Sequence, residues 1–259
     1  MLNAIVEYGG VKMVADLGLP LDISLPLHSG PDQVQAWYVG PLVIEPVRTE
    51  HFTGSVKEGG SVNFRNISFN PHGHGTHTEC VGHIAPEVFS INKALANYHF
   101  VSRLISLRPE KAKKQAPYML PSDNVITAEQ LHEACGEDVP EALVIRTLPN
   151  TNKTSAVYSN TNPAYLTSEA ATWLVKEGVK HLLLDLPSVD REDDGGELNA
   201  HHIFWNFPSN PRHDATITEM IFVADHIKDG LYLLNLAVAP FENDASPSRP
   251  VLYSLQEMA

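Results

Sequence analysis

The segment TSEAATWLVKEGVKHLLLD, residues 167–185, decides the class of fold. Thr167 or Ser168 can cap a helix, and the apolar residues at 170, 171, 174 and 175 form one stripe along it. Gly178 is typical of a helix end, and the apolar run that follows predicts a strand buried on both faces. A second apolar stretch, at 142–147, predicts a parallel partner strand, so the chain contains a βαβ crossover.

The remaining pattern extends this unit into a mixed α/β domain. Thr127 and Gln130 fit a capping box, which predicts a helix over 128–135. No shift in composition marks a linker, so we expect residues 1–259 to form a single domain. Apolar residues with β spacing predict further strands at 21–27, 37–39, 42–47 and 61–69, the last with a bulge near Asn66.

Composition excludes several classes of function. Lys and Arg number 18 against 31 Asp and Glu, a net charge of −13, which opposes binding to nucleic acid or to anionic lipid. Two cysteines, Cys80 and Cys135, are too few for a disulfide framework. The N-terminus lacks the features of a signal peptide, and no apolar stretch is long enough to cross a membrane. We therefore expect a cytoplasmic protein with no nucleic-acid or membrane partner.

The segment NPHGHGTHTECVGH, residues 70–83, carries the strongest chemical signal. It places His72, His74, His77, Glu79 and His83 within twelve residues. Imidazole and carboxylate are the ligands of zinc and of similar divalent metals. In a strand the residues at 77, 79 and 83 share one face, whereas those at 72 and 74 have the opposite parity. The glycines at 73 and 75 could turn one of these two inward. Histidines exposed on a polar loop are the alternative explanation.

Three later positions are further candidates. If His201 and His202 lie on a strand, they point to opposite faces, so at most one of them is catalytic. Glu219 lies in a β-branched apolar run, where it is either a buried carboxylate that needs a partner such as a metal or an exposed residue of an edge strand. Asp190 follows the predicted strand at 180–186, at the end where parallel sheets place their sites, although an exposed carboxylate fits equally.

These motifs together resemble a known family. Gly75-Thr-His-Thr-Glu79 with His83 is similar to the signature His-x-Gly-Thr-His-x-Asp-x-Pro-x-His of the cyclase-type metal-dependent hydrolases, which include bacterial kynurenine formamidase and isatin hydrolase. The sequences at 144–147 and 184–190, then His201 and Glu219, follow in the family's order. The resemblance implies a single α/β domain with a mixed β-sheet and flanking helices, in a cyclase-like swivelling β/β/α architecture.

The resemblance also implies a chemistry. Water activated by a divalent metal would cleave a C–N bond in an amide, an aryl formamide similar to N-formylkynurenine, or a lactam, with a role in tryptophan catabolism. It further implies a homodimer or homotetramer. One or two zinc or manganese ions would be held by His74, His77, Glu79, His83 and Glu219, with His201 as the catalytic proton shuttle and His72, His202 and Asp190 as alternate ligands or orienting residues.

The sequence departs from the family signature at three positions. Glu79 stands for the usual Asp, Val81 for the proline, and Gly73 for the first histidine, so either His74 or His72 must reach the metal or that ligand is missing. A catalytically impaired relative that binds a metal or a small acid is therefore an alternative. A cupin-like iron oxygenase is another, although the βαβ unit argues against an all-β barrel.

Overall fold

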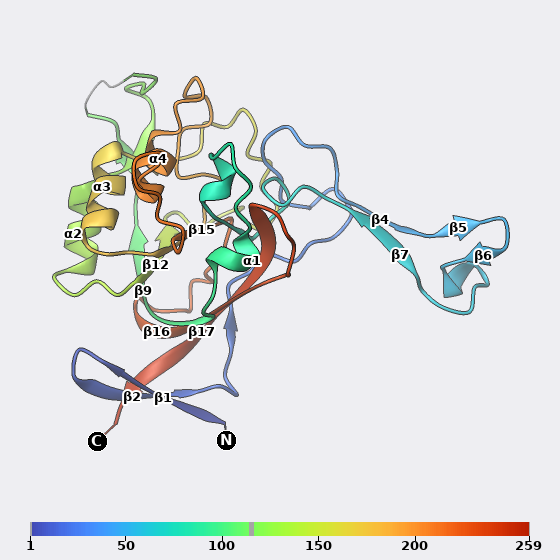
Figure 1. The fold of residues 1–259 in the computed structure, drawn as a ribbon, viewed down its shortest axis with the longest axis horizontal. Helices are drawn as coiled ribbons and strands as arrows, with labels where there is room; N and C mark the ends of the chain where they lie inside the picture. The colour runs from blue at the N-terminus through green and yellow to red at the C-terminus, as the bar shows by residue number, and fades with distance from the viewer. Residues whose placement is uncertain (1, 114–116, 259) are drawn as a thin grey trace.

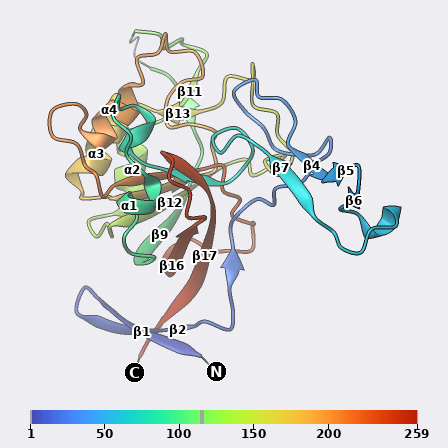
Figure 2. The same cartoon turned by 45° about the vertical axis from the view of Figure 1, so that its right-hand side comes forward.

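The computed structural model describes residues 2–113 and 117–258, which are organised around one mixed sheet (Figures 1 and 2). The strand order is β1-β2-β17-β16-β9-β12-β14-β15-β8, and β3 pairs with β17. Because β8 also pairs with β17, the sheet closes on itself. Its strands are β1 (Asn3–Tyr8), β2 (Val11–Asp16), β3 (Leu21–Asp22), β8 (His77–Glu79), β9 (His99–Leu107), β12 (Ala142–Thr147), β14 (His181–Leu184), β15 (Thr216–Glu219), β16 (Gly230–Val238) and β17 (Ala245–Glu257).

The predicted βαβ unit is confirmed and forms the parallel core of the sheet. β9, β12, β14 and β15 are parallel neighbours, and α3 (Ser168–Lys176) connects β12 to β14. The Thr167 side chain caps this helix by accepting a hydrogen bond from the Ala170 amide. All six residues of β12 are buried, as expected for a parallel strand covered on both faces. The mixed α/β fold predicted from the sequence is therefore correct.

Helices cover one face of the sheet, and Ile91 and Leu95 contribute to the core on the other face. α2 (Ala128–Cys135), α3 and α4 (Asn199–Trp205) lie together on one side (Figure 1). They enclose a core that includes Leu131, Leu174 and Phe204. The capping box of α2 is confirmed. The remaining short elements are α1 (Ile91–Ala94), the 3₁₀ helices η1 (Val56–Glu58) and η2 (Val81–His83), and a small sheet of β10 (Glu110–Lys111), β11 (Asn124–Ile126) and β13 (Tyr165–Leu166).

Residues 43–68 form a separate feature, the arm, which projects from the body in both views (Figures 1 and 2). Apolar side chains on the arm are open to solvent, with Phe64 58% and Ile67 59% exposed. The arm consists of two narrow ladders, β4 (Val43–Pro46) with β7 (Arg65–Ser68) and β5 (Arg48–Thr49) with β6 (Phe52–Thr53).

Three strand predictions need correction. The strand predicted over 61–69 is reduced to β7, which pairs with β4 in continuous register, so the bulge near Asn66 is wrong. The strand predicted at 37–39 is also wrong, because Trp37 and Tyr38 adopt positive φ values of 58° and 55° and form a turn. In the segment 21–27 only β3 is paired, although the predicted alternation of burial is present.

Two remaining observations concern membrane-spanning helices and the cysteines. No helix of the described residues is long and apolar enough to cross a lipid bilayer. Cys80 and Cys135 are both buried free thiols.

Candidate metal centre

The candidate metal centre lies where the sheet closes, between β15 and β17. β8 runs between them and carries His77 and Glu79, which are two residues apart and therefore project from the same face. Glu219, the last residue of β15, is the direct partner of His77 in the ladder. The 3₁₀ turn η2 then brings His83 back toward Glu79. Segments far apart in the sequence thus meet at one point.

His77 and Glu219 form a fully buried pair within the centre. Nε2 of His77 lies 3.4 Å from Oε2 of Glu219. Nδ1 of His77 donates a hydrogen bond to the Gly75 carbonyl at 2.9 Å, so the neutral ring presents a lone pair at Nε2. This Nε2 and Oε1 of Glu219 are buried without a hydrogen-bond partner among the described residues. Such atoms are rare in folded proteins, and a cation would satisfy both. Glu219 is 3% exposed, so it is not an exposed residue of an edge strand.

Glu79 occupies the middle of the cluster. Its Oε1 lies 3.2 Å from Nε2 of His201, and its Oε2 lies 3.0 Å from Nδ1 of His72 and 3.8 Å from Nδ1 of His83. The carboxylate is 1% exposed. Because its two oxygens face different imidazoles, Glu79 can interact with more than one group or ion at once.

The two buried glutamates have opposite electrostatic tendencies. Burial opposes the ionisation of Glu79, but the charges and hydrogen bonds of His83, His201 and His72 outweigh it and lower the pKa of Glu79. Burial and the nearby charge of Glu79 raise the pKa of Glu219, and His77 offsets only part of this. Two adjacent buried carboxylates repel each other when both are ionised. A positive charge bound between them would therefore stabilise the centre.

Asp190 holds His201 in place. Its Oδ2 lies 2.7 Å from Nδ1 of His201, and its two oxygens also accept the backbone amides of Ala200 and His201 at 2.7 and 3.1 Å. Burial opposes protonation of His201, but the hydrogen bonds to Asp190 and Glu79 raise its pKa to about 10. Asp190 thus fixes the first turn of α4 and the orientation of the His201 ring in one interaction.

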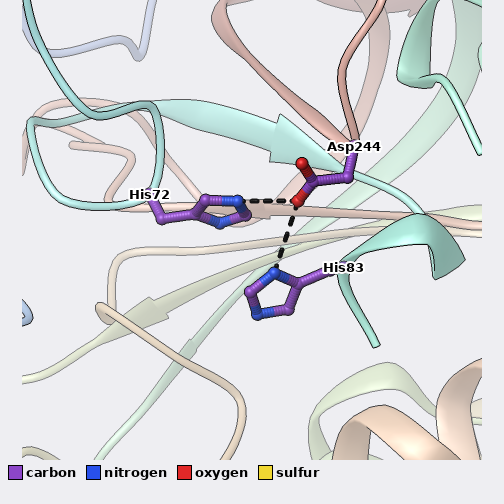
Figure 3. A group of neighbouring side chains, drawn as sticks. All are labelled: His72, His83 and Asp244. Atoms are coloured by element: carbon purple, nitrogen blue, oxygen red, sulfur yellow. Dashed lines mark hydrogen bonds and ion pairs between the residues drawn. The ribbon is translucent and has the colours of Figure 1, made fainter. Parts of the chain in front are cut away.

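His72 enters the cluster from the loop before β8, and Asp244 enters from the loop between β16 and β17. Nε2 of His72 lies 2.8 Å from Oδ2 of Asp244, and Nδ1 of His83 lies 3.4 Å from the same oxygen (Figure 3). Burial opposes protonation of His72, but its hydrogen bonds to Asp244 and Glu79 raise its pKa to about 10. The same contacts with His72 and His83 overcome burial and lower the pKa of Asp244.

The structure does not bring His74 or His202 to the cluster. Nδ1 of His74 accepts the Asn70 amide at 2.8 Å, and its Nε2 donates to the Gly40 carbonyl at 2.7 Å, so both ring nitrogens anchor a loop. His202 lies on the helix α4 rather than on a strand, and its Nδ1 is 3.2 Å from the Phe207 carbonyl. Of the histidine pair, only His201 faces the centre.

Packing explains why the imidazole comes from position 72. A Cβ atom at Gly73 would lie 2.8 Å from both methyl groups of Val39, so a side chain fits there only if Val39 moves. The loop instead directs His72 inward, with its ring 5.2 Å from that of His77 between centroids. An imidazole therefore reaches His77 from the residue before Gly73.

Sequence reasoning missed Asp244. The residue lies in the loop before β17, and only the pairing of Ala245 with Glu79 in the closed sheet brings it to the centre. No local motif around it carries that information, since the pairing joins segments at opposite ends of the chain.

The donor atoms of the cluster fit a borderline divalent cation. Imidazole nitrogens and carboxylate oxygens are the ligands of zinc and manganese sites. The described residues provide three overlapping groups whose donor atoms lie within 4.8 Å of one another, namely His72–His77–Glu79, Glu79–His83–His201 and His72–His83–Asp244.

Comparison with known proteins assigns the fold and site to a class. The family model described as "Putative cyclase" matches residues 15–191, and the chain belongs to this cyclase family. Kynurenine formamidase of Bacillus cytotoxicus is 40% identical over 92 residues. That alignment covers 35% of this chain and only 40% of the relative's length.

Solved structures agree on the fold. A potential metal-dependent hydrolase with cyclase activity superposes with a TM-score of 0.63 at 15% identity, covering 91% of this chain and 97% of the other. Isatin hydrolase A from Labrenzia aggregata superposes with a TM-score of 0.60 at 15% identity, covering 92% and 94%. At these identities the comparison concerns the fold alone.

Proposed function

We propose that this chain is a metal-dependent hydrolase that cleaves a C–N bond in an amide, an aryl formamide or a lactam. The observation that carries the proposal is the buried pair of His77 Nε2 and Glu219 Oε1, which have no hydrogen-bond partner among the described residues. Keeping two such atoms in a dry site is costly unless a cation binds there. Membership of the cyclase family and the likeness to kynurenine formamidase support the choice of reaction.

The proposed ligands are His72, His77, Glu79, His83 and Glu219, which hold one or two ions of zinc or manganese. A bound divalent ion of this kind supplies an activated water near neutral pH and polarises a carbonyl oxygen. Glu79 keeps the cluster together because its oxygens face imidazoles on both sides. The extra methylene of Glu79, relative to the Asp of the family signature, lets one carboxylate reach both His72 and His201.

We assign the proton transfer to His201. Its Nδ1 is held by Asp190, so Nε2 is the atom through which the ring exchanges protons: the protonated ring donates its proton to the leaving nitrogen and regains one from the attacking water. Asp190 stabilises the protonated ring and prevents it from rotating away. The low exposure of His201, 2%, keeps bulk water from competing for that proton.

The principal alternative is a relative that binds a metal or a small acid without turnover. The hydrogen-bonded chain Asp190–His201–Glu79 argues for catalysis, because a binding site alone has no need of an oriented proton shuttle. We propose N-formylkynurenine as the first substrate to test, followed by simple aryl formamides and by isatin.

The deciding experiment measures metal content and turnover together. Dialysed protein is analysed by plasma mass spectrometry and assayed with the three substrates, alongside His77→Ala and His202→Ala. We expect His77→Ala to lose metal and turnover, while His202→Ala, which alters the neighbour of His201 that faces away, keeps both. Wild-type protein that binds neither zinc nor manganese, or a fully active His77→Ala variant, contradicts the proposal.

We further infer that residues 1–259 act as one domain in a cytoplasmic homodimer or homotetramer. Two buried free thiols are compatible with a reducing compartment. The exposed apolar residues of the arm, such as Phe64 and Ile67, favour association between copies, since monomers rarely display such surfaces. Light scattering of the purified protein tests the oligomeric state.

A further inference from the structure

We propose that Asp244 is a metal ligand and that, together with His72 and His83, it forms a second cation position beside that of His77 and Glu219. This inference rests on the proposed function, since it concerns the same centre. It adds a residue that lies outside the histidine motif and specifies where a second ion binds. We call the two places the inner position (His77 and Glu219) and the outer position (His72, His83 and Asp244).

The spacing of the donor atoms carries the proposal. Oδ2 of Asp244 lies 2.8 Å from Nε2 of His72 and 3.4 Å from Nδ1 of His83 (Figure 3). Two ligands that bind the same zinc ion at about 2.0–2.2 Å lie roughly 3–3.5 Å apart, so the separation of Asp244 and His83 suits a shared ion. The separation of Asp244 and His72 is that of a hydrogen bond, and a small outward shift of the His72 ring would let both side chains bind the ion. A simple ion pair between Asp244 and His72 does not require a second imidazole at the same oxygen.

The fold builds Asp244 into this place with backbone contacts on either side. The Cys80 amide donates to the Asp244 carbonyl at 3.0 Å, and the Ile91 amide donates to the neighbouring Asn243 carbonyl at 2.8 Å. A Cβ atom at Gly82 would lie 3.2 Å from the Cβ of Asp244 and 2.3 Å from the Phe89 carbonyl oxygen. The absence of a side chain at Gly82 therefore allows the loop to approach closely. Asp244 is fixed relative to β8, and so relative to Glu79.

The two positions differ in their access to solvent. The side chains of the inner position are 0% and 4% exposed, for His77 and Glu219. Those of the outer position are 20%, 30% and 25% exposed, for His72, His83 and Asp244. The outer position therefore has room for water or substrate oxygen to complete the coordination of an ion, which a catalytic site requires.

Glu79 links the two positions. Its Oε2 faces His72 and His83 of the outer position, while the charge of its carboxylate acts directly on Glu219 of the inner one. A single carboxylate between two cations reduces their mutual repulsion, as in two-metal hydrolytic sites. The three carboxylates Glu79, Glu219 and Asp244 together also supply enough negative charge for two divalent ions to bind close together.

The test is a zinc titration of the metal-free full-length protein, read out as bound zinc per chain after desalting and as the shift in unfolding temperature. We expect about two zinc ions in wild type and about one in Asp244→Asn. Glu242→Gln is the matched control, because Glu242 lies in the same loop but bonds to Asn92, and it should retain both ions. Glu219→Gln should lose the inner ion instead, which distinguishes the two positions.

Several results overturn the proposal. One such result is two ions in Asp244→Asn with unchanged affinity, and another is a single ion in wild type. Either would indicate that Asp244 serves only to hold His72, and neither would contradict the proposed hydrolase. Wild type that binds no zinc would instead contradict the proposed function itself. If Asp244→Asn unfolds without metal, His83→Gln removes a ligand of the outer position from a different element. It should cause the same loss of one ion, and retention of both would contradict the assignment.

Discussion

The body and the arm of this molecule are made of similar strands, yet they are stabilised in different ways. In β12 every residue is buried, with Leu143 and Ile145 packed under the helices and Ala142 and Val144 in the core on the opposite face. In β7 every residue is exposed, and its pairing with β4 has no covering layer. Burial on two faces stabilises the body independently of any partner, whereas the arm has its ladder hydrogen bonds and a few local contacts, such as the Arg48–Glu58 ion pair and the contact of the Phe52 and Phe64 rings.

The difference has a functional meaning. The candidate metal centre is built entirely from the body, whose packing can hold side chains to the tolerance that catalysis requires. The arm is exposed and apolar, which suits contact with another copy of the chain. Substitutions in the two regions should therefore affect different properties of the protein.

The largest effect is expected from a cavity in the body. Leu143→Ala should lower the free energy of unfolding by about 2–5 kcal/mol, because it removes a fully buried side chain from the core beneath the helices. Urea unfolding followed by circular dichroism measures the change. Ile67→Ala in the arm is the control and should shift the free energy of unfolding by less than about 0.5 kcal/mol. Equal losses from both variants would contradict the distinction between the regions.

A pH effect on stability should also originate in the body. Burial, reinforced by nearby Lys180, lowers the pKa of His181 to about 4, below the value of about 6.5 expected in the unfolded chain. Between these pH values the unfolded state binds a proton that the folded state excludes, so stability falls as pH drops from about 6.5 to about 4. The loss should reach up to about 3 kcal/mol.

Substitution of His181 tests this assignment. His181→Gln keeps a polar group near Thr216, which lies 2.9 Å from Nδ1 of the ring, but it cannot titrate. Unfolding temperatures measured from pH 7 to pH 4 should therefore decline less in the variant than in wild type. Parallel curves for the two proteins would assign the pH dependence to other groups.

Asp190→Asn should reduce catalysis rather than folding. The variant keeps an oxygen for the amides of Ala200 and His201 but weakens the hold on the His201 ring, so kcat should fall about 10–100-fold with little change in KM. Steady-state kinetics on a hydrolysed substrate measures this split. Asp193→Asn, an exposed neighbour, is the control. A higher KM with unchanged kcat would argue against a role in orienting His201.

The smallest effect on stability, and the clearest effect on assembly, is expected in the arm. Phe64→Ser should change the free energy of unfolding by no more than about 0.5 kcal/mol, because its ring is already 58% exposed. The molar mass measured by light scattering should be lower for this variant than for wild type, because fewer copies of the chain associate. A wild-type protein that is already a monomer would contradict the proposed assembly.

The same contrast separates what the sequence could predict from what it could not. β12, α2 and α3 were predictable because their periodicity and caps are local and agree with their burial. The strand predicted over 61–69 was wrong because the arm has no buried face. Its apolar pattern therefore does not correspond to burial. The apolar residues at 37–39 predict a strand, but Trp37 and Tyr38 adopt left-handed backbone and form a turn, which their spacing does not indicate.

Some residues of the candidate centre could likewise be predicted from the sequence, and others could not. His77, Glu79 and His83 are placed by spacing within one short segment, so the sequence indicates their common face. The choice of His72 over His74 depends on the hydrogen bonds of the His74 ring to the Asn70 amide and the Gly40 carbonyl, and the latter is a tertiary contact. Asp244 depends on the closure of the sheet and could not be found from any local pattern.

That closure also sets when the centre can exist during synthesis of the protein. β8 is paired on one side by β15 and on the other by β17, which is synthesised long after β8. A nascent chain that has released the histidine segment but not β17 holds several imidazoles without Asp244 and without the final strand of the sheet. Because contacts this distant in sequence form late, a complete metal centre can arise only after β17 has been synthesised.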